Sequence, residues 1–258
     1  MMGRVGEGGA GNGAHRQSRP GTRKRWSAIE RELRAATGPL IAGIDEVGRG
    51  PLAGPVVACA IIMPPDRRAI AGVDDSKRLP ASDRVRLAVS IRSRALAIGL
   101  GAASVREIER LNIYHATTLA MRRALHRLQM RPDHVLLDGR SIAALDTAHT
   151  AVVGGDARCY SIACASIVAK VTRDRLMHAL AARYPGYAWE RNVGYATRDH
   201  LDGLGERGLT VHHRRTFFRV KQLLLDLDPP SSDSRASAAL ARGPGPCIEI
   251  LVPGEAQA

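Results

Sequence analysis

Two apolar segments separated by a short connection of glycine and proline constrain the fold of this chain most. Residues 40–44 and 55–63 are rich in Ile, Val and Ala, and the connection between them contains Gly48-Arg49-Gly50-Pro51. Short apolar runs bounded by turn residues are typical of neighbouring antiparallel strands. The sequence therefore predicts that an antiparallel sheet begins near residue 40.

The rest of the chain alternates between apolar runs and segments with helical spacing. Further strands are predicted at residues 95–103, 134–137 and 150–153. Helices are predicted at residues 26–36, from residue 82 or 83, and at 105–128, 161–184, 197–207 and 216–227. This order predicts an α/β domain whose mixed sheet has three antiparallel strands first and parallel strands after them. Helices flank the sheet, and the C-terminal part is helical.

The charge of the chain favours a polyanionic partner. There are 38 Lys and Arg residues against 25 Asp and Glu, a formal net charge of +13. Such an excess is typical of proteins that bind nucleic acid or an anionic membrane surface. Aromatic residues make up only 3% of the chain, which argues against a single-strand-binding protein that stacks many bases. No run approaches the roughly 20 apolar residues of a membrane-spanning helix, so we expect no membrane insertion.

The two ends of the chain differ in composition from its middle. Residues 1–25 contain six Arg and Lys residues against Glu7, and we expect a flexible basic tail. Residues 229–258 are rich in Pro, Ser, Ala and Gly, which predicts a disordered tail. One folded domain is expected over residues 26–228. The four cysteines form no C-x-x-C pair, which fits free thiols in a reducing cytoplasm.

Four acidic residues stand where predicted strands end. Asp45 and Glu46 follow the first apolar run, Asp138 follows residues 135–137, and Asp156 follows residues 152–155. Each could simply begin a turn, which is a common role of Asp. Sites in α/β sheets, however, form outside the carboxyl ends of strands, and carboxylates that converge there need a cation to offset their repulsion.

The adjacent pair needs a special geometry if both carboxylates serve one site. Successive side chains of a regular strand point to opposite faces, so a bulge or the following glycine turn would have to redirect Asp45 or Glu46. Hard oxygen ligands suit Mg²⁺ or Mn²⁺. Two such ions about 3.5–4 Å apart can activate water and stabilise the leaving oxygen in phosphodiester hydrolysis.

An ordered series of motifs resembles the type 2 ribonucleases H, specifically the bacterial ribonuclease HII family. The motifs, in chain order, are Ile44-Asp45-Glu46-Val47-Gly48-Arg49-Gly50-Pro51, Asp75-Ser76-Lys77, Leu137-Asp138-Gly139, Gly155-Asp156-Ala157, Ser166-Ile167-Val168-Ala169-Lys170, Gly194-Tyr195-Ala196-Thr197 and His213-Arg214-Arg215-Thr216-Phe217. The resemblance covers about residues 38–225. The whole ordered set is far more specific than any one of its members.

The resemblance implies a ribonuclease H-like fold and a metal-dependent endonuclease. The expected substrates are the RNA strand of RNA–DNA hybrids and single ribonucleotides embedded in duplex DNA, as in ribonucleotide excision repair. The products would carry 5′-phosphate and 3′-hydroxyl ends. By motif match, the catalytic and metal-binding set comprises Asp45, Glu46, Asp138 and Asp156. Two ions, Mn²⁺ or Mg²⁺, are the implied cofactors.

The resemblance also implies a set of substrate-binding residues. Gly48, Arg49 and Gly50 would contact the ribose and its phosphates, although the same residues could form a plain tight turn. Lys77 would contact a phosphate or remain a solvated lysine. Tyr195 would stack near the sugar that follows the ribonucleotide, or lie partly buried in the core.

A basic cluster and two further features leave alternatives open. His212-His213-Arg214-Arg215 is the densest basic cluster of the body, and we expect Arg214 and Arg215 to face phosphates rather than form a solvated surface or a zinc site. Residues 222–227 faintly resemble a sliding-clamp peptide, but an apolar helix face is the favoured interpretation. Arg173 and Asp174 could form a surface ion pair.

Two other functions compete with the hybrid endonuclease. One is a catalytically silent nucleic-acid-binding module on the same fold, and the presence of all four acids argues against it. The other is the sister enzyme ribonuclease HIII, which carries an added N-terminal substrate-binding domain. Only about 36 residues precede the predicted sheet, too few for that domain. We expect a monomer.

Overall fold

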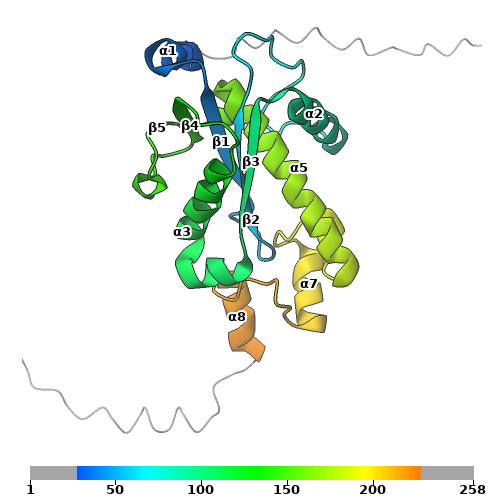
Figure 1. Cartoon of the computed structure of the whole chain (residues 1–258). Helices are drawn as coiled ribbons and strands as arrows, with labels where there is room; N and C mark the ends of the chain where they lie inside the picture. Colours follow the sequence, from blue (N-terminus) through cyan, green and yellow to red (C-terminus); the bar gives the residue numbers. More distant parts are fainter. Residues whose placement is uncertain (1–27, 228–258) are drawn as a thin grey trace, which may run out of the picture.

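A mixed five-stranded sheet forms the centre of the protein (Figure 1), as a computed structural model shows for residues 28–227. The strand order is β3-β2-β1-β4-β5. The strands are β1 (Ile41–Val47), β2 (Val56–Ile62), β3 (Ala97–Ala103), β4 (His134–Asp138) and β5 (His149–Val152). The pairs β1–β2 and β2–β3 are antiparallel, whereas β1–β4 and β4–β5 are parallel. The predicted fold class is confirmed.

Helices cover both faces of the sheet and form the C-terminal part. They are α1 (Ala28–Thr37), α2 (Ala81–Arg94), α3 (Val105–His126), the 3-10 turn η1 (Ala143–Leu145), α4 (Gly155–Arg158), α5 (Tyr160–Arg183), α6 (Trp189–Asn192), α7 (Arg198–Arg207) and α8 (Phe218–Leu227). The long helices lie within a few residues of their predicted bounds. The short helices α4 and α6 were not predicted, because four residues are too few to show helical periodicity.

The two faces of the sheet carry separate apolar cores. Figure 1 shows α3 on one face and α5 with α2 on the other. Along β2, Ala58, Ala60 and Ile62 pack in the core beneath α3, and the alternating residues Cys59 and Ile61 pack in the core beneath α5. Every residue of β2 is therefore buried, as expected for a strand covered on both faces.

Small residues let α5 lie directly on β1. A Cβ atom on Gly43 would collide with the backbone of Ser161 at the start of α5. The first half of α5 is buried and includes Ala163, Cys164 and Ala165. This close packing places α5 beside the C-terminal end of β1, where Asp45 and Glu46 lie.

The C-terminal helices pack beyond the end of β1. Trp189 is fully buried there against Leu52, Ala53 and Met177, and Figure 1 shows α7 and α8 at this end of the molecule. The backbone of residues 222–227 belongs to α8, but the side chains that would form a clamp peptide lie beyond Gln222, outside the described side chains. The predicted tails also lie outside the described residues. Within residues 28–227, no helix is both long enough and apolar enough to span a bilayer.

Candidate active site

Three aspartates converge at the carboxyl ends of β1 and β4. One carboxylate oxygen from each of Asp45, Asp138 and Asp156 lies within 4.8 Å of the other two. The parallel pairing of β1 with β4 places Ile44 opposite Leu137, so Asp45 and Asp138 are the next residues on both strands. The backbone N–H of Gly155 donates to Oδ1 of Asp138 at 2.7 Å, which brings Asp156 at the start of α4 beside the other two.

Glu46 does not join this group. Strand β1 continues through Val47 in regular pairing with β2, with Asp45 opposite Cys59 and Glu46 opposite Ala58. The bulge or turn that would redirect one carboxylate is therefore not formed, and Glu46 points toward the α3 face. Its Oε1 accepts a hydrogen bond from Nη1 of Arg49 at 3.2 Å.

Burial raises the pKa of the carboxyl groups at this site. The pKa of Asp45 lies well above its ordinary value because the group is buried, and the neighbouring charges of Glu46 and Asp138 raise it further. Burial also raises the pKa of Asp138, while the hydrogen bond from Gly155 opposes this shift. For Glu46, burial raises the pKa and the nearby Arg49 guanidinium opposes it.

This donor set fits a divalent cation. Three buried or half-buried carboxylates whose oxygens lie this close repel one another when ionised, and a bound cation offsets the repulsion. Carboxylate oxygens are the hard ligands that Mg²⁺ and Mn²⁺ prefer. Lys77 supplies one positive charge, with Nζ at 3.4 Å from Oδ2 of Asp156, but its side chain is 80% exposed. A screened surface lysine offsets little of the charge.

A cleft of about 330 Å³ opens beside the aspartates. Five of the seven predicted substrate-binding residues line it, together with Asp45, Glu46 and Asp138; the five are Gly48, Arg49, Gly50, Lys77 and Tyr195. A Cβ atom on Gly50 would lie 3.7 Å from Cε1 of Tyr195, so the glycine segment and the tyrosine ring are neighbours. Tyr195 is 43% exposed and thus accessible from solvent.

The match to known proteins agrees with this geometry. The sequence model of the Ribonuclease HII family matches residues 42–221. The chain belongs to the ribonuclease HII family. A curated ribonuclease HII from Granulibacter bethesdensis is 54% identical, over 78% of this chain and 94% of the relative. Enzymes of this family cleave the RNA of RNA–DNA hybrids with the help of divalent metal ions.

Solved structures share the fold. The ribonuclease H2 of Pyrococcus horikoshii superposes with a TM-score of 0.66 at 24% identity, covering 74% of this chain and 99% of that one. Bst-RNase HIII in complex with Mn²⁺ has a TM-score of 0.61 at 19% identity, covering 79% of this chain and 74% of that one. The antiparallel start and parallel continuation of the sheet are therefore the ribonuclease H-like arrangement that the sequence predicted.

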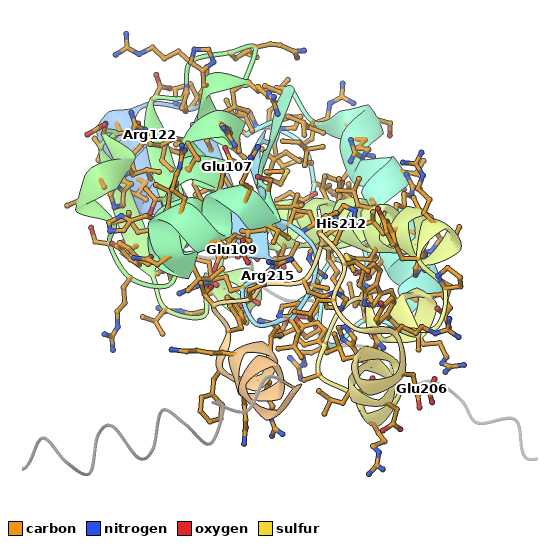
Figure 2. The ribbon with its side chains drawn as sticks, turned by 90° about the horizontal axis from the view of Figure 1, so that it is seen from below. Glu107, Glu109, Arg122, Glu206, His212 and Arg215 are labelled. Carbon is orange, nitrogen blue, oxygen red and sulfur yellow. The ribbon has the colours of Figure 1, made fainter. Side chains whose placement is uncertain are left out.

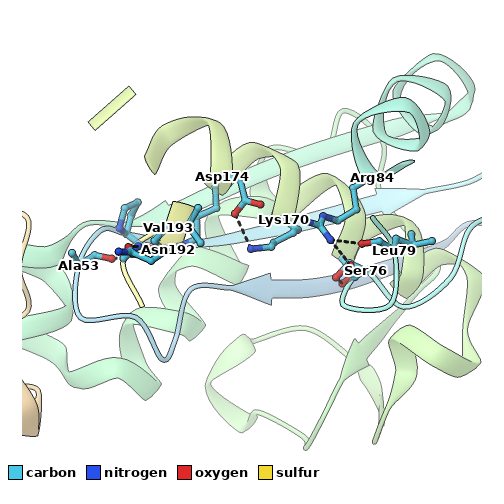
Figure 3. A network of polar contacts seen from close by, with 12 residues as sticks. Ala53, Ser76, Leu79, Arg84, Lys170, Asp174, Asn192 and Val193 are labelled. Atoms are coloured by element: carbon cyan, nitrogen blue, oxygen red, sulfur yellow. Dashed lines mark hydrogen bonds and ion pairs between the residues drawn. The ribbon is translucent and has the colours of Figure 1, made fainter. Parts of the chain in front are cut away.

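Two residues of α5 that line this ribonuclease HII cleft were not predicted as site residues from the sequence. Ser166 and Lys170 of α5 line the cleft, and Lys170 Nζ donates to Oδ1 of Asp174 at 2.8 Å (Figure 3). A hydrogen bond from Ser166 lowers the pKa of Asp45. Their spacing of four residues places them on one face of the helix, and this spacing is the signal that could have identified them.

The segment that carries Lys77 is fixed to α5 and α2. The hydroxyl groups of Ser76 and Ser166 are 2.8 Å apart. Arg84 of α2 donates to the carbonyl oxygens of Ser76 and Leu79 (Figure 3). These bonds hold the backbone on both sides of Lys77, from which its ammonium group reaches the carboxylate of Asp156 at 3.4 Å.

The prediction that Arg214 faces phosphate is wrong. Arg214 is 0% exposed, and its guanidinium donates to backbone carbonyl groups inside the protein. Arg215 is exposed, and its backbone N–H donates to Oε1 of Glu109 on α3 at 2.8 Å (Figure 2). Only the second of the two arginines has a side chain that solvent or a phosphate can reach.

Arg173 and the ring of His213 lie inside the protein. Arg173 forms no surface ion pair with Asp174, since its side chain is 0% exposed and Asp174 pairs with Lys170 instead. The ring of His213 is buried, with Nε2 at 3.1 Å from Nε2 of His200. Neither His212 nor His213 belongs to a cluster of metal-ligating groups among the described residues.

A larger cavity lies at the opposite end of β4. Its volume is about 520 Å³, and its lining includes Arg122, His126, His134 and Asp146. Arg122 is in an ion pair with Asp146, at 3.2 Å. It shares no lining residue with the cleft at the aspartates, and it holds none of the three converging carboxylates. The smaller cleft is thus the candidate active site.

Proposed function

We propose that this ribonuclease HII hydrolyses the RNA strand of RNA–DNA hybrids and also nicks duplex DNA at single embedded ribonucleotides. The products would have 5′-phosphate and 3′-hydroxyl ends. The observation that carries the proposal is the convergence of Asp45, Asp138 and Asp156 beside a cleft lined by Gly48-Arg49-Gly50 and Tyr195. The cleft combines a hydrolytic centre with groups that can distinguish ribose from deoxyribose.

The carboxylates are proposed to hold two divalent ions, Mn²⁺ or Mg²⁺. Asp45, Asp138 and Asp156 would provide ligands to these ions, and Glu46, whose pKa is raised in part by the charge of Asp138, would complete the set. When bound, two such ions activate water and stabilise the leaving oxygen. The Arg49 guanidinium restrains the carboxylate of Glu46 through their ion pair at 3.2 Å.

Residues around the carboxylates are proposed to bind and orient the nucleic acid. The backbone of Gly48-Arg49-Gly50 would contact a sugar with its 2′-hydroxyl, and the missing side chain of Gly50 leaves room for that approach, since a Cβ atom there would have only Cε1 of Tyr195 within 4 Å. Tyr195 offers an exposed ring against which the next sugar can pack. Lys77 and Lys170, at the edge of the cleft, would contact the phosphates on either side.

The test compares three duplexes of one sequence. One contains a single ribonucleotide, one is a continuous RNA–DNA hybrid, and one is DNA only. We expect the first two to be cut in Mg²⁺ or Mn²⁺ and to stay intact in chelator, and the third to stay intact throughout. Failure to nick the single-ribonucleotide duplex in either metal would refute the proposed substrate range.

The site assignment is tested separately with Asp138→Asn. The amide oxygen of Asn can still accept the hydrogen bond from Gly155, so the local fold is retained while a negative ligand is lost. We expect cleavage to fall to background while hybrid binding, measured by fluorescence anisotropy, is largely kept. A variant that cleaves at near the wild-type rate would show that the assignment is wrong, and a wild-type protein that binds but never cleaves would indicate a silent binding module.

A further inference from the structure

Two buried arginines connect the glycine segment of the cleft to the segment that carries Tyr195. We propose that Arg173 and Arg214 are positioning residues that hold Gly48-Arg49-Gly50 and Tyr195 at a fixed separation, so that recognition of a single ribonucleotide depends on two side chains that never contact the substrate. This inference rests on the proposed function for its substrate, and on the hydrogen bonds of the two guanidinium groups for its geometry.

Arg214 holds the backbone of the glycine segment Gly48-Arg49-Gly50 through hydrogen bonds. Its Nη1 donates to the carbonyl oxygen of Arg49 at 2.9 Å, and its Nη2 donates to that of Gly48 at 2.6 Å. Nε and Nη2 both donate to the carbonyl oxygen of Gly54, at 3.0 and 2.7 Å. One guanidinium thus closes the turn over residues 48–54 by binding both of its ends.

Arg173 joins the same turn to the tyrosine segment. Its Nε donates to Pro55 at 3.0 Å and its Nη2 to Ala53 at 3.0 Å, while Nη1 donates to Val193 at 2.9 Å, all at the carbonyl oxygens. Figure 3 shows Ala53 and Val193 beside each other, although 140 positions separate them in the sequence. A Cβ atom on Gly48 would collide with Nε of Arg173, so the glycine segment also packs directly on this side chain.

Backbone hydrogen bonds continue the connection. The N–H of Leu52 donates to the carbonyl oxygen of Gly194 at 2.8 Å, and the N–H of Gly54 donates to that of His212 at 2.9 Å. Tyr195 directly follows Gly194. The turn over residues 48–54 and the backbone segment that carries Tyr195 therefore belong to one hydrogen-bonded unit whose centre is the arginine pair.

Only arginine can satisfy this set of acceptors. Its planar guanidinium has five N–H donors in a rigid fork, whereas a lysine has three donors on one flexible atom. Carbonyl oxygens are the acceptors of both side chains, and among the described residues neither guanidinium has a carboxylate within ion-pair distance. Burial lowers the pKa of Arg214 to about 9, and the nearby charge of Arg173 contributes to that shift. Burying two like charges side by side costs free energy that an apolar pair would not, which fits a positioning role rather than mere packing.

A fixed separation matters more for a single ribonucleotide than for a continuous hybrid. In a duplex with one ribonucleotide, only one alignment presents a ribose to the glycine segment and a deoxyribose to Tyr195. A continuous hybrid presents a ribose in every alignment, so small changes in separation are tolerated. Weakening the hydrogen bonds of Arg173 or Arg214 should therefore change the ratio of kcat/KM for the two substrates, and not only the total activity.

The experiment uses the full-length protein with Arg173→Lys and Arg214→Lys, and Arg122→Lys as the matched control at the opposite end of β4. For each lysine variant of the pair, we expect the ratio of kcat/KM for the single-ribonucleotide duplex to that for the hybrid to fall about tenfold, since small misplacements at a reacting centre can cost up to about a hundredfold. Partial unfolding reduces both values by the same factor and leaves the ratio unchanged. The ratio of the Arg122→Lys control should equal that of the wild type.

Amide hydrogen exchange of the metal-free protein tests the connection without any substrate. In Arg173→Lys, we expect faster exchange in residues 48–55 and in residues 193–195 together, whereas in Arg214→Lys the change should centre on residues 48–54. An unchanged substrate ratio, or exchange that speeds up in neither segment of Arg173→Lys, overturns the inference. If the wild-type enzyme does not nick the single-ribonucleotide duplex, the proposed function fails, and the exchange result still decides whether the arginines join the two segments.

Discussion

Asp45 and Glu46 are adjacent in the sequence but extend from β1 toward opposite faces of the sheet. Asp45 lies on the α5 side and clusters with Asp138 and Asp156, whereas Glu46 lies on the α3 side in an ion pair with Arg49. The two carboxylates can therefore reach the same bound substrate only from different directions. Replacing Asp45 and replacing Glu46 should therefore affect metal binding differently.

Metal affinity should depend more on Asp45 than on Glu46. We expect Asp45→Asn to weaken Mn²⁺ binding by about tenfold to a hundredfold, and Glu46→Gln to weaken it less, because only Asp45 is in the cluster of three. Isothermal titration of each variant with Mn²⁺ measures this difference. Equal losses in the two variants would contradict the separation seen in the structure.

The metal-free protein should lose stability as the pH rises above the acidic range. Burial raises the pKa of Asp45 in the folded state above its value in the unfolded chain. The folded state therefore binds more protons than the unfolded state at intermediate pH, and the contribution of Asp45 to stability is greatest at low pH and is lost as the pH rises. Asp45→Asn should remove most of this dependence and raise the Tm in chelator at pH 8. Thermal unfolding of both proteins from pH 5 to pH 8 measures it, and a Tm of the variant below that of the wild type at pH 8 would argue against strain among the carboxylates.

The start of α3 should show the opposite pH dependence. Ser104 caps this helix, and Glu107 accepts hydrogen bonds from Arg123 and from Ser104, which lowers the pKa of Glu107 to about 2. A lowered folded pKa contributes stability above the unfolded value near 4.5 that is lost as the pH falls toward 2. We expect Glu107→Gln to lower the free energy of unfolding by about 1 kcal/mol at pH 7, with the difference vanishing near pH 2. Urea denaturation at several pH values tests this, and a constant difference would exclude the charge as its cause.

Lys77 and Lys170 should contribute charge rather than sequence recognition. Each lysine that contacts a phosphate releases about one counterion, so Lys77→Ala and Lys170→Ala should each reduce the slope of log K against log salt concentration by about 1. Arg122→Ala, at the other cavity, should leave the slope unchanged. Anisotropy titrations of a hybrid from 50 to 200 mM salt, about the range in which such contacts dominate, measure these slopes. A slope that all three variants change equally would indicate a general effect of net charge.

Deletion of residues 1–25 should weaken hybrid binding mainly at low salt. This segment carries six basic residues against Glu7, and the cleft with its aspartates is formed entirely by residues 45–195. Electrostatic affinity of such a segment is independent of sequence and is screened by salt. The cleavage position, mapped on a sequencing gel, should stay the same. A shifted cut would mean that the N-terminal segment takes part in positioning the substrate.

Local patterns in the sequence were sufficient to predict the order of strands and helices and the three aspartates that converge at the site. Each of these patterns involves only a few neighbouring positions. They are the apolar runs of strand length, the helical spacing over residues 105–128 and 161–184, and the acids at strand ends. Parallel pairing of β1 with β4 then brings Asp45 and Asp138 together, because both follow the last paired residues of adjacent strands. These features need no long-range information beyond the strand order.

The tertiary structure alone decided which charged side chains are buried and what they contact. Arg214 lies in the densest basic cluster of the body and was predicted to face phosphate, yet its acceptors are carbonyl groups some 160 residues earlier in the chain. Likewise, the direction of Glu46 depends on whether β1 stays paired with β2 through Val47, which the glycines after it do not determine. The sequence determined which residues meet at this end of the sheet. Only the packing of distant segments determined whether a charged side chain at this end points to solvent or binds the backbone. The physical reason is that the carbonyl groups that accept hydrogen bonds from a buried guanidinium lie far from it in the sequence, where no local pattern can connect them.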